Sequence, residues 1–267
     1  MGSSNTPIQT EVIQSIKEHG YWVGNVSQLW GTKSIKLLER CDILLKPLKE
    51  ELKKSRLNNL VGNAGLISRE NENRIIYQAG LEQSILEIAH QILGIEPGYD
   101  GAELRISKAA PEGEKRDNSG TKTRHFDIEE GGQGHSTLKI IVYLNDVGIN
   151  NGPFTFINED GSEKPITGEK ETVIFANTGK YEHYGAPLIN GIRETLQLSI
   201  HTNSPYAEFC VIYLHSLRLV RRMTIGLTDY QKRVASWRRR FPYLFIPVMY
   251  HIPFTNFRPG SWTNRKR

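Results

Sequence analysis

The first apolar residues of the chain recur at helical spacing. Positions 8, 12, 13 and 16 are all Ile or Val and fall on one stripe of a helix. Thr6 and Gln9 stand three residues apart in the pattern of a capping box, in which each side chain accepts a hydrogen bond from the other residue's backbone. Gly20 follows where a left-handed residue would end the helix. The pattern therefore predicts a helix between Thr6 and Gly20.

Longer helices are predicted further along. Inward-facing apolar positions indicate one helix over residues 34–54, where Pro47 is expected to cause a kink, and another over residues 75–93. Between the first helix and these two, residues 21–23 have the aromatic and β-branched character of a short strand. The first third of the chain is therefore expected to be largely helical.

Beyond residue 97 the pattern changes to short segments rich in β-branched and aromatic residues. Clusters of Gly, Pro, Asn and Asp separate them, which is typical of a sandwich, barrel or jelly roll. The predicted strands are residues 102–106, 138–145, 153–158, 172–176 and 195–202. Helices followed by strands favour a mixed α+β, mainly β fold in which the helices pack on one face of the β-core.

The remaining segments define the expected organisation of the chain. Residues 108–123 are polar and predict a long loop, and residues 128–137, rich in Gly and Glu, predict either a mobile loop over a site or a plain connector. We expect one folded unit over residues 1–206 and a basic, partly helical extension over residues 207–267.

The composition is ordinary, but the charge is distributed unevenly along the chain. The 267 residues are 38% hydrophobic and 24% charged, and no apolar run approaches the roughly 20 residues needed to cross a bilayer. With only Cys41 and Cys210, no disulfide framework is indicated, and a cytoplasmic protein is expected. The net charge of +5 combines 12 Lys and Arg against two acids in residues 207–267 with an acidic remainder. This basic extension predicts either an anionic partner or a solvated or intramolecularly packed tail.

Three residues form a candidate metal site. His125 and Asp127 stand two positions apart, so in an extended chain both side chains project from the same face. His183 follows the predicted strand 172–176. Two histidines and one carboxylate on one side of a metal ion form the facial triad of non-haem Fe(II) enzymes, which leaves positions open for other ligands.

A candidate anion receptor lies ten residues beyond His183. In an extended strand Arg193 and Thr195 would share one face, and the apolar residues 196, 198 and 200 would occupy the other face. A guanidinium group beside a hydroxyl group is suited to binding a carboxylate, and a buried arginine needs such a partner. A surface pairing of Arg193 with Glu194 or Glu182 is the competing interpretation.

Taken together, these motifs resemble the phytanoyl-CoA dioxygenase-like branch of the 2-oxoglutarate/Fe(II) oxygenases. The resemblance rests on His125-x-Asp127, on residues 138–147, on Asn-Gly-Pro-Phe at 151–154, and on His183 and Arg193. Residues 18–23 also resemble the family's N-terminal segment. The similarity extends over about residues 8–202 and leaves out the basic extension.

The resemblance implies a double-stranded β-helix, or jelly roll, with Fe(II) bound by His125, Asp127 and His183. It implies that 2-oxoglutarate chelates the iron and places its C5 carboxylate on Arg193 and Thr195. Dioxygen is then the second co-substrate, and succinate and CO2 are the co-products of oxidising a small organic substrate. Asp127 favours hydroxylation or a similar oxidation, because related halogenases lack this carboxylate. Two departures from the family are Arg124, where an aromatic residue is common, and Thr195, where serine is.

The sequence leaves the roles of several residues, and two alternative functions, undecided. Lys139 is expected to point toward either solvent or the site, while His135 and His201 are interpreted as structural. Three aromatic residues are interpreted as core rather than substrate contacts: Tyr143, Phe154 and Phe156. The alternatives in function are the same chemistry on a membrane-associated or, less favoured, a nucleic-acid substrate recruited by the extension, and a jelly-roll binding protein without turnover.

Overall fold

A computed structural model describes residues 5–54, 59–62, 74–94, 97–109, 123–127 and 137–202. The predicted extension over residues 207–267 lies outside this part of the chain, as do His135 and most of the two predicted loops. The side chain of His201 is also outside it. The proposed boundary between residues 206 and 207 therefore stays a prediction.

The N-terminal helices follow their capping signals. Helix α1, Pro7–His19, has the predicted capping box at Thr6 and ends at Gly20, whose φ is 86°. Helix α3, Lys33–Lys54, runs through Pro47 instead of ending there. A short helix that the apolar pattern did not indicate, α2, Val26–Trp30, begins at a second capping box formed by Asn25 and Gln28. No helix in the described ranges has the length and apolar character needed to span a membrane.

The predicted helix over residues 75–93 is wrong in one respect, because the structure contains two helices there. These are α5, Arg74–Ala79, and α6, Gln83–Leu93. Trp30 Nε1 donates a hydrogen bond of 2.9 Å to the carbonyl oxygen of Ala79. A Cβ atom on Gly80 would lie 2.1 Å from the ring of Tyr99, so the backbone packs directly on that ring. These two tertiary contacts occupy the point where a continuous helix would pass.

Six antiparallel strands form the larger sheet, in the order β1-β7-β4-β9-β3-β2. Two of them are longer than predicted, because Pro97–Lys108 pairs with Ile192–Thr202 along almost its whole length. The strands are β1 (Tyr21–Asn25), β2 (Asn59–Gly62), β3 (Pro97–Lys108), β4 (Thr137–Tyr143), β7 (Thr172–Ala176) and β9 (Ile192–Thr202).

A smaller antiparallel sheet has the order β6-β5-β8. Its strands are β5 (Phe154–Ile157), β6 (Glu163–Ile166) and β8 (His183–Gly185). Only β5 was predicted. The three-residue strand β8 is too short to show an alternating pattern in the sequence.

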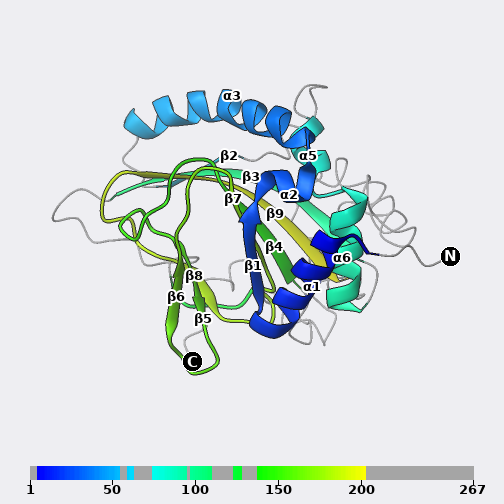
Figure 1. Ribbon diagram of the computed structural model, residues 1–267. Helices are drawn as coiled ribbons and strands as arrows, with labels where there is room; N and C mark the ends of the chain where they lie inside the picture. Colours follow the sequence, from blue (N-terminus) through cyan, green and yellow to red (C-terminus); the bar gives the residue numbers. More distant parts are fainter. Residues whose placement is uncertain are drawn as a thin grey trace, which may run out of the picture.

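The larger sheet separates two apolar clusters. On its outer face, Leu196, Leu198 and Ile200 of β9 pack with residues of all five described helices. On its inner face, Ile141 and Tyr143 belong to a second cluster that includes side chains of the smaller sheet. Figure 1 shows the helices on the side of the larger sheet away from β5, β6 and β8. The predicted mixed α+β architecture, with helices on one face, is thus confirmed.

Candidate metal centre and anion pocket

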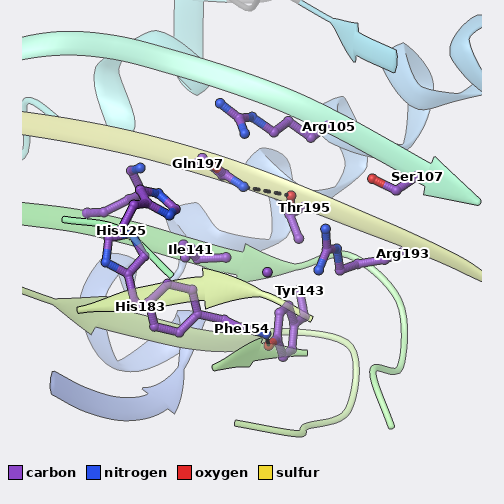
Figure 2. A pocket seen from close by; sticks show the side chains of 12 residues that line it. Arg105, Ser107, His125, Ile141, Tyr143, Phe154, His183, Arg193, Thr195 and Gln197 are labelled. Carbon is purple, nitrogen blue, oxygen red and sulfur yellow. Dashed lines mark hydrogen bonds between the residues drawn. The ribbon is translucent and has the colours of Figure 1, made fainter. Parts of the chain in front are cut away.

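A cavity opens between the two sheets and collects most of the polar residues selected from the sequence. His125 and His183 lie at one end of it, and Arg193 lies toward the other end (Figure 2). Strand β9 contributes Arg193, Thr195 and Gln197, which alternate with its core residues. The face that the sequence predicted for Arg193 and Thr195 is therefore the inner face of the sheet.

Backbone pairing brings the three candidate metal ligands together. His125 and His183 form an isolated antiparallel bridge, in which each N–H donates to the other residue's carbonyl oxygen at 3.0 and 2.9 Å. The N–H of Asp127 donates to the carbonyl oxygen of Thr178 at 2.9 Å. Residues 123–127 thus lie alongside the turn and strand that carry His183. This pairing brings His125 and His183 together although they are 58 residues apart in the sequence.

The three side chains offer ligand atoms that all lie within 4.8 Å of one another. The Nδ1 atoms of His125 and His183 lie 2.7 and 3.2 Å from the backbone carbonyl oxygens of Thr123 and Tyr181. Because a carbonyl oxygen can only accept, each Nδ1 carries the hydrogen and each Nε2 keeps its lone pair. The Nε2 atoms lie 3.7 and 3.5 Å from the carboxylate oxygens of Asp127. This donor set fits a divalent transition metal.

The electrostatics of the site favour the metal-binding forms of these groups. Burial alone would raise the pKa of Asp127, but the charge of Lys139 holds it well below its usual range. Burial, together with the charge of His183, lowers the pKa of His125 and favours its neutral imidazole. These shifts favour the anionic form of Asp127 and the neutral imidazole of His125 near neutral pH.

Lys139 points into the site rather than toward solvent, which settles the choice that the sequence left open. Its Nζ lies 2.5 Å from Oδ2 of Asp127. That buried oxygen accepts no hydrogen bond of good geometry from the described residues, although it lies this close to the ammonium group. Lys139 thus neutralises the carboxylate mainly by charge, and the oxygen keeps lone-pair capacity for a metal ion.

Arg193 lies in the cavity without a carboxylate partner among the described residues. Burial lowers the pKa of its guanidinium, an effect that the proximity of Tyr143 only partly offsets. Its Nη1 donates to the carbonyl oxygen of Gly152. Glu194 faces the other way and pairs with Lys49 of α3 at 2.8 Å. The competing surface pairing of Arg193 with Glu194 is therefore wrong.

Asn145 holds the backbone on both sides of Arg193. Its Nδ2 donates to the carbonyl oxygen of Ile192 at 2.8 Å, and its Oδ1 accepts from the N–H of Glu194 at 2.7 Å. One side chain therefore satisfies the two peptide groups that flank the arginine. This clamp orients the start of β9 so that Arg193 enters the cavity.

The aromatic residues divide between core and cavity. Phe156 is buried in the inner cluster, as predicted. Tyr143 and Phe154 belong to that cluster but also line the cavity, which the sequence interpretation missed. The ring of Phe154 stacks on that of His183 at 5.3 Å between centroids. The hydroxyl of Tyr143 donates to the carbonyl oxygen of Ile166 and accepts from the N–H of Phe154.

Three further polar residues of the lining were not selected from the sequence: Arg105, Ser107 and Gln197. Arg105 and Ser107 lie directly opposite Thr195 and Arg193 in the β3–β9 register. The signal was present as the alternation of polar residues with Leu104 and Ile106. This alternation indicated a strand with one polar and one apolar face, but it did not indicate which strand lies next to β3 in the sheet.

Replacing Lys139 with methionine is expected to destabilise the metal-free protein and to enlarge its stabilisation by metal. Breaking a buried ion pair costs roughly 3–5 kcal/mol, and the cost here should be lower because both side chains keep some contact with solvent. A divalent ion would supply the missing positive charge. Thermal unfolding with and without Zn²⁺ or Ni²⁺ measures both effects.

Lys170→Met is the matched control, because Lys170 pairs with Asp42 at a more exposed site outside the cavity. Lys170→Met should change neither the stability of the metal-free protein nor its stabilisation by metal appreciably. If Lys139→Met left the metal-free stability unchanged but weakened 2-oxoglutarate binding, the lysine would serve the co-substrate rather than Asp127.

No protein-family model and no curated protein sequence matches the chain. Solved structures do match its fold. AviO1 from Streptomyces viridochromogenes Tue57 aligns over 76% of this chain and 98% of its own, with a TM-score of 0.55 and 12% identity. HygX from Streptomyces hygroscopicus, with nickel and 2-oxoglutarate bound, aligns over 75% and 88%, with a TM-score of 0.52 and 11% identity. The chain thus shares the fold of these two proteins.

Proposed function

We propose that the protein is an Fe(II)- and 2-oxoglutarate-dependent dioxygenase that oxidises a small organic substrate. The observation that carries the proposal is that two imidazoles and a carboxylate converge at one end of a cavity whose lining also contains a half-buried arginine with no carboxylate partner in the described chain. A metal ion and a dicarboxylate would together satisfy both halves of this site. The resemblance to phytanoyl-CoA dioxygenase-like enzymes supports the same assignment.

In this proposal His125, Asp127 and His183 hold the iron, and Arg193 and Thr195 bind the C5 carboxylate of 2-oxoglutarate. The bound iron supplies the oxidative chemistry, with 2-oxoglutarate and dioxygen consumed and succinate and CO2 released. The protein contributes orientation. The backbone carbonyls of residues 123 and 181 fix the tautomers of the two histidines, and Asn145 fixes the strand that carries Arg193.

The fold supports the proposal at two points. Two facing antiparallel sheets, together with the likeness to AviO1 and HygX, support a jelly-roll core. HygX binds 2-oxoglutarate with nickel, and another structure of it contains iron, at a TM-score of 0.51 to this chain. The carboxylate of Asp127 would be a ligand to the iron that halogenases lack, so we propose hydroxylation or a related oxidation.

The test combines a binding signal and a turnover signal. Anaerobic addition of Fe(II) and 2-oxoglutarate together should produce a weak visible charge-transfer band that neither produces alone. Air should then allow 2-oxoglutarate-dependent release of succinate, which a panel of small metabolites should accelerate when it contains the substrate. A charge-transfer band without any succinate release would favour a non-catalytic binding protein. Absence of the band would contradict the proposal.

A further inference from the structure

The cavity contains a second guanidinium group that the proposed function leaves unused. Ala102, Leu104 and Ile106 of β3 are buried against the helices, so Glu103, Arg105 and Ser107 face inward. Register places Arg105 directly opposite Thr195, one strand away from the proposed co-substrate anchor. Figure 2 shows Arg105 and Gln197 above Thr195, on the side away from Phe154.

Arg105 is held in place by one carboxylate oxygen. Its Nε and Nη2 donate to the same Oε2 of Glu103, at 3.0 and 2.7 Å. Within the described residues its Nη1 has no partner, and Oε1 of Glu103 has none either. The arginine side chain is 23% exposed and the glutamate side chain 43%. Glu103 therefore tethers Arg105 from the more exposed side and leaves one edge of the guanidinium group available.

The other cations of the cavity have assigned partners. Lys139 pairs with Asp127, and Arg193 would be neutralised by the co-substrate. The charge of Arg105 adds to the effect of burial in lowering the pKa of Arg193, so the two guanidinium groups repel each other across the cavity. A second anion would relieve this repulsion, and a guanidinium edge fits a carboxylate or phosphate group.

We propose that Arg105 binds an anionic group, carboxylate or phosphate, of the primary substrate, so that the enzyme oxidises small organic acids or phosphate esters. Gln197 of β9 lines the cavity together with Arg105 of β3, and it supplies an amide for the same group. This inference rests on the proposed function, because it assumes that 2-oxoglutarate occupies Arg193. It assigns the two arginines to two different ligands.

The test observes both arginines separately. The full-length protein is labelled with ¹⁵N-arginine, loaded with diamagnetic Zn(II), and saturated with 2-oxoglutarate. Arg105→Lys and Arg193→Lys assign the two Nε–H signals. Acetate, methylphosphonate and neutral acetamide are then titrated in separate samples. We expect the Arg193 signal to move with 2-oxoglutarate and the Arg105 signal to move afterwards, saturably, with acetate or methylphosphonate but not with acetamide.

The two charged probes distinguish the two sources of the anion, because the one that binds more tightly indicates a carboxylate or a phosphate substrate. Arg105→Gln should weaken that binding by about 10- to 100-fold while the affinity for 2-oxoglutarate stays within threefold. Lys33→Gln, on the outer helix α3, should change neither.

Each failure has its own signature. If 2-oxoglutarate alone moves the Arg105 signal and the probes add nothing, both arginines bind the co-substrate and the inference is overturned. If no charged probe moves the Arg105 signal, the Arg105–Glu103 pair is only structural. If 2-oxoglutarate leaves the Arg193 signal in place, the proposed function loses its co-substrate anchor, whatever happens at Arg105.

Discussion

Arg193→Ala is expected to raise the 2-oxoglutarate concentration needed for half-maximal turnover by about 100- to 1,000-fold, while the affinity for Fe(II) barely changes. The arginine is half-buried in the lining of the cavity, and no carboxylate of the described chain pairs with it. Its loss would leave the C5 carboxylate of the co-substrate with the hydroxyl of Thr195 but without a charged partner. Removing one member of a buried pair typically costs roughly 3–5 kcal/mol, far more than the ~0–1 kcal/mol of an exposed pair.

Two further variants make this result specific. Arg193→Lys should recover only part of the affinity, since an ammonium group cannot reproduce the planar fork of a guanidinium group. Lys33→Ala removes an exposed cation of α3, paired with Glu82, and should have no effect on either ligand. The dependence of succinate release on 2-oxoglutarate concentration measures the requirement for the co-substrate. Anaerobic titration with Fe(II) measures the affinity for iron. A change of less than about threefold in Arg193→Ala would withdraw the anchor assignment.

The features of the fold and of the candidate site that could be predicted are those that depend on residues close together in the sequence. The capping box at Thr6 required only residues three positions apart. The separation of Arg193 and Thr195 from the apolar face of β9 required only strand alternation. The grouping of His125 with Asp127 likewise followed from their i, i+2 spacing, and the structure places both beside His183. Local periodicity is therefore enough to identify which side chains share a face.

The features that escaped prediction depend on partners distant in the sequence. Arg105 enters the cavity because β3 lies next to β9, and strand order cannot be read from either strand alone. The direction of Lys139 became clear only once Asp127 was placed beside it. The break between α5 and α6 occurs where Trp30 and Tyr99 contact the chain, although the local pattern continues through residues 80–82. In each case a tertiary contact determined the structure where the local sequence pattern allowed two alternatives.

The largest effect is expected at the metal site itself. Asp127→Ala should weaken Fe(II) binding by more than about 100-fold, because even the loss of a group that only supports a ligand commonly costs 10- to 100-fold. Succinate release should fall below detection. His125→Ala/Asp127→Ala should give the same result while the far-ultraviolet circular dichroism of the protein is retained, since neither side chain belongs to the apolar clusters.

Stability measurements can separate the loss of a metal ligand from the loss of the ion pair with Lys139. Asp127→Ala leaves that lysine in the cavity without its anion, so the metal-free variant should unfold at a lower temperature than the parent. Asp127→Ala/Lys139→Met removes both charges and should recover most of this stability but none of the iron binding. If iron binding returned together with stability, Asp127 would act only as the partner of Lys139. If His125→Ala/Asp127→Ala still released succinate at the parental rate, the metal site would have to lie elsewhere in the chain.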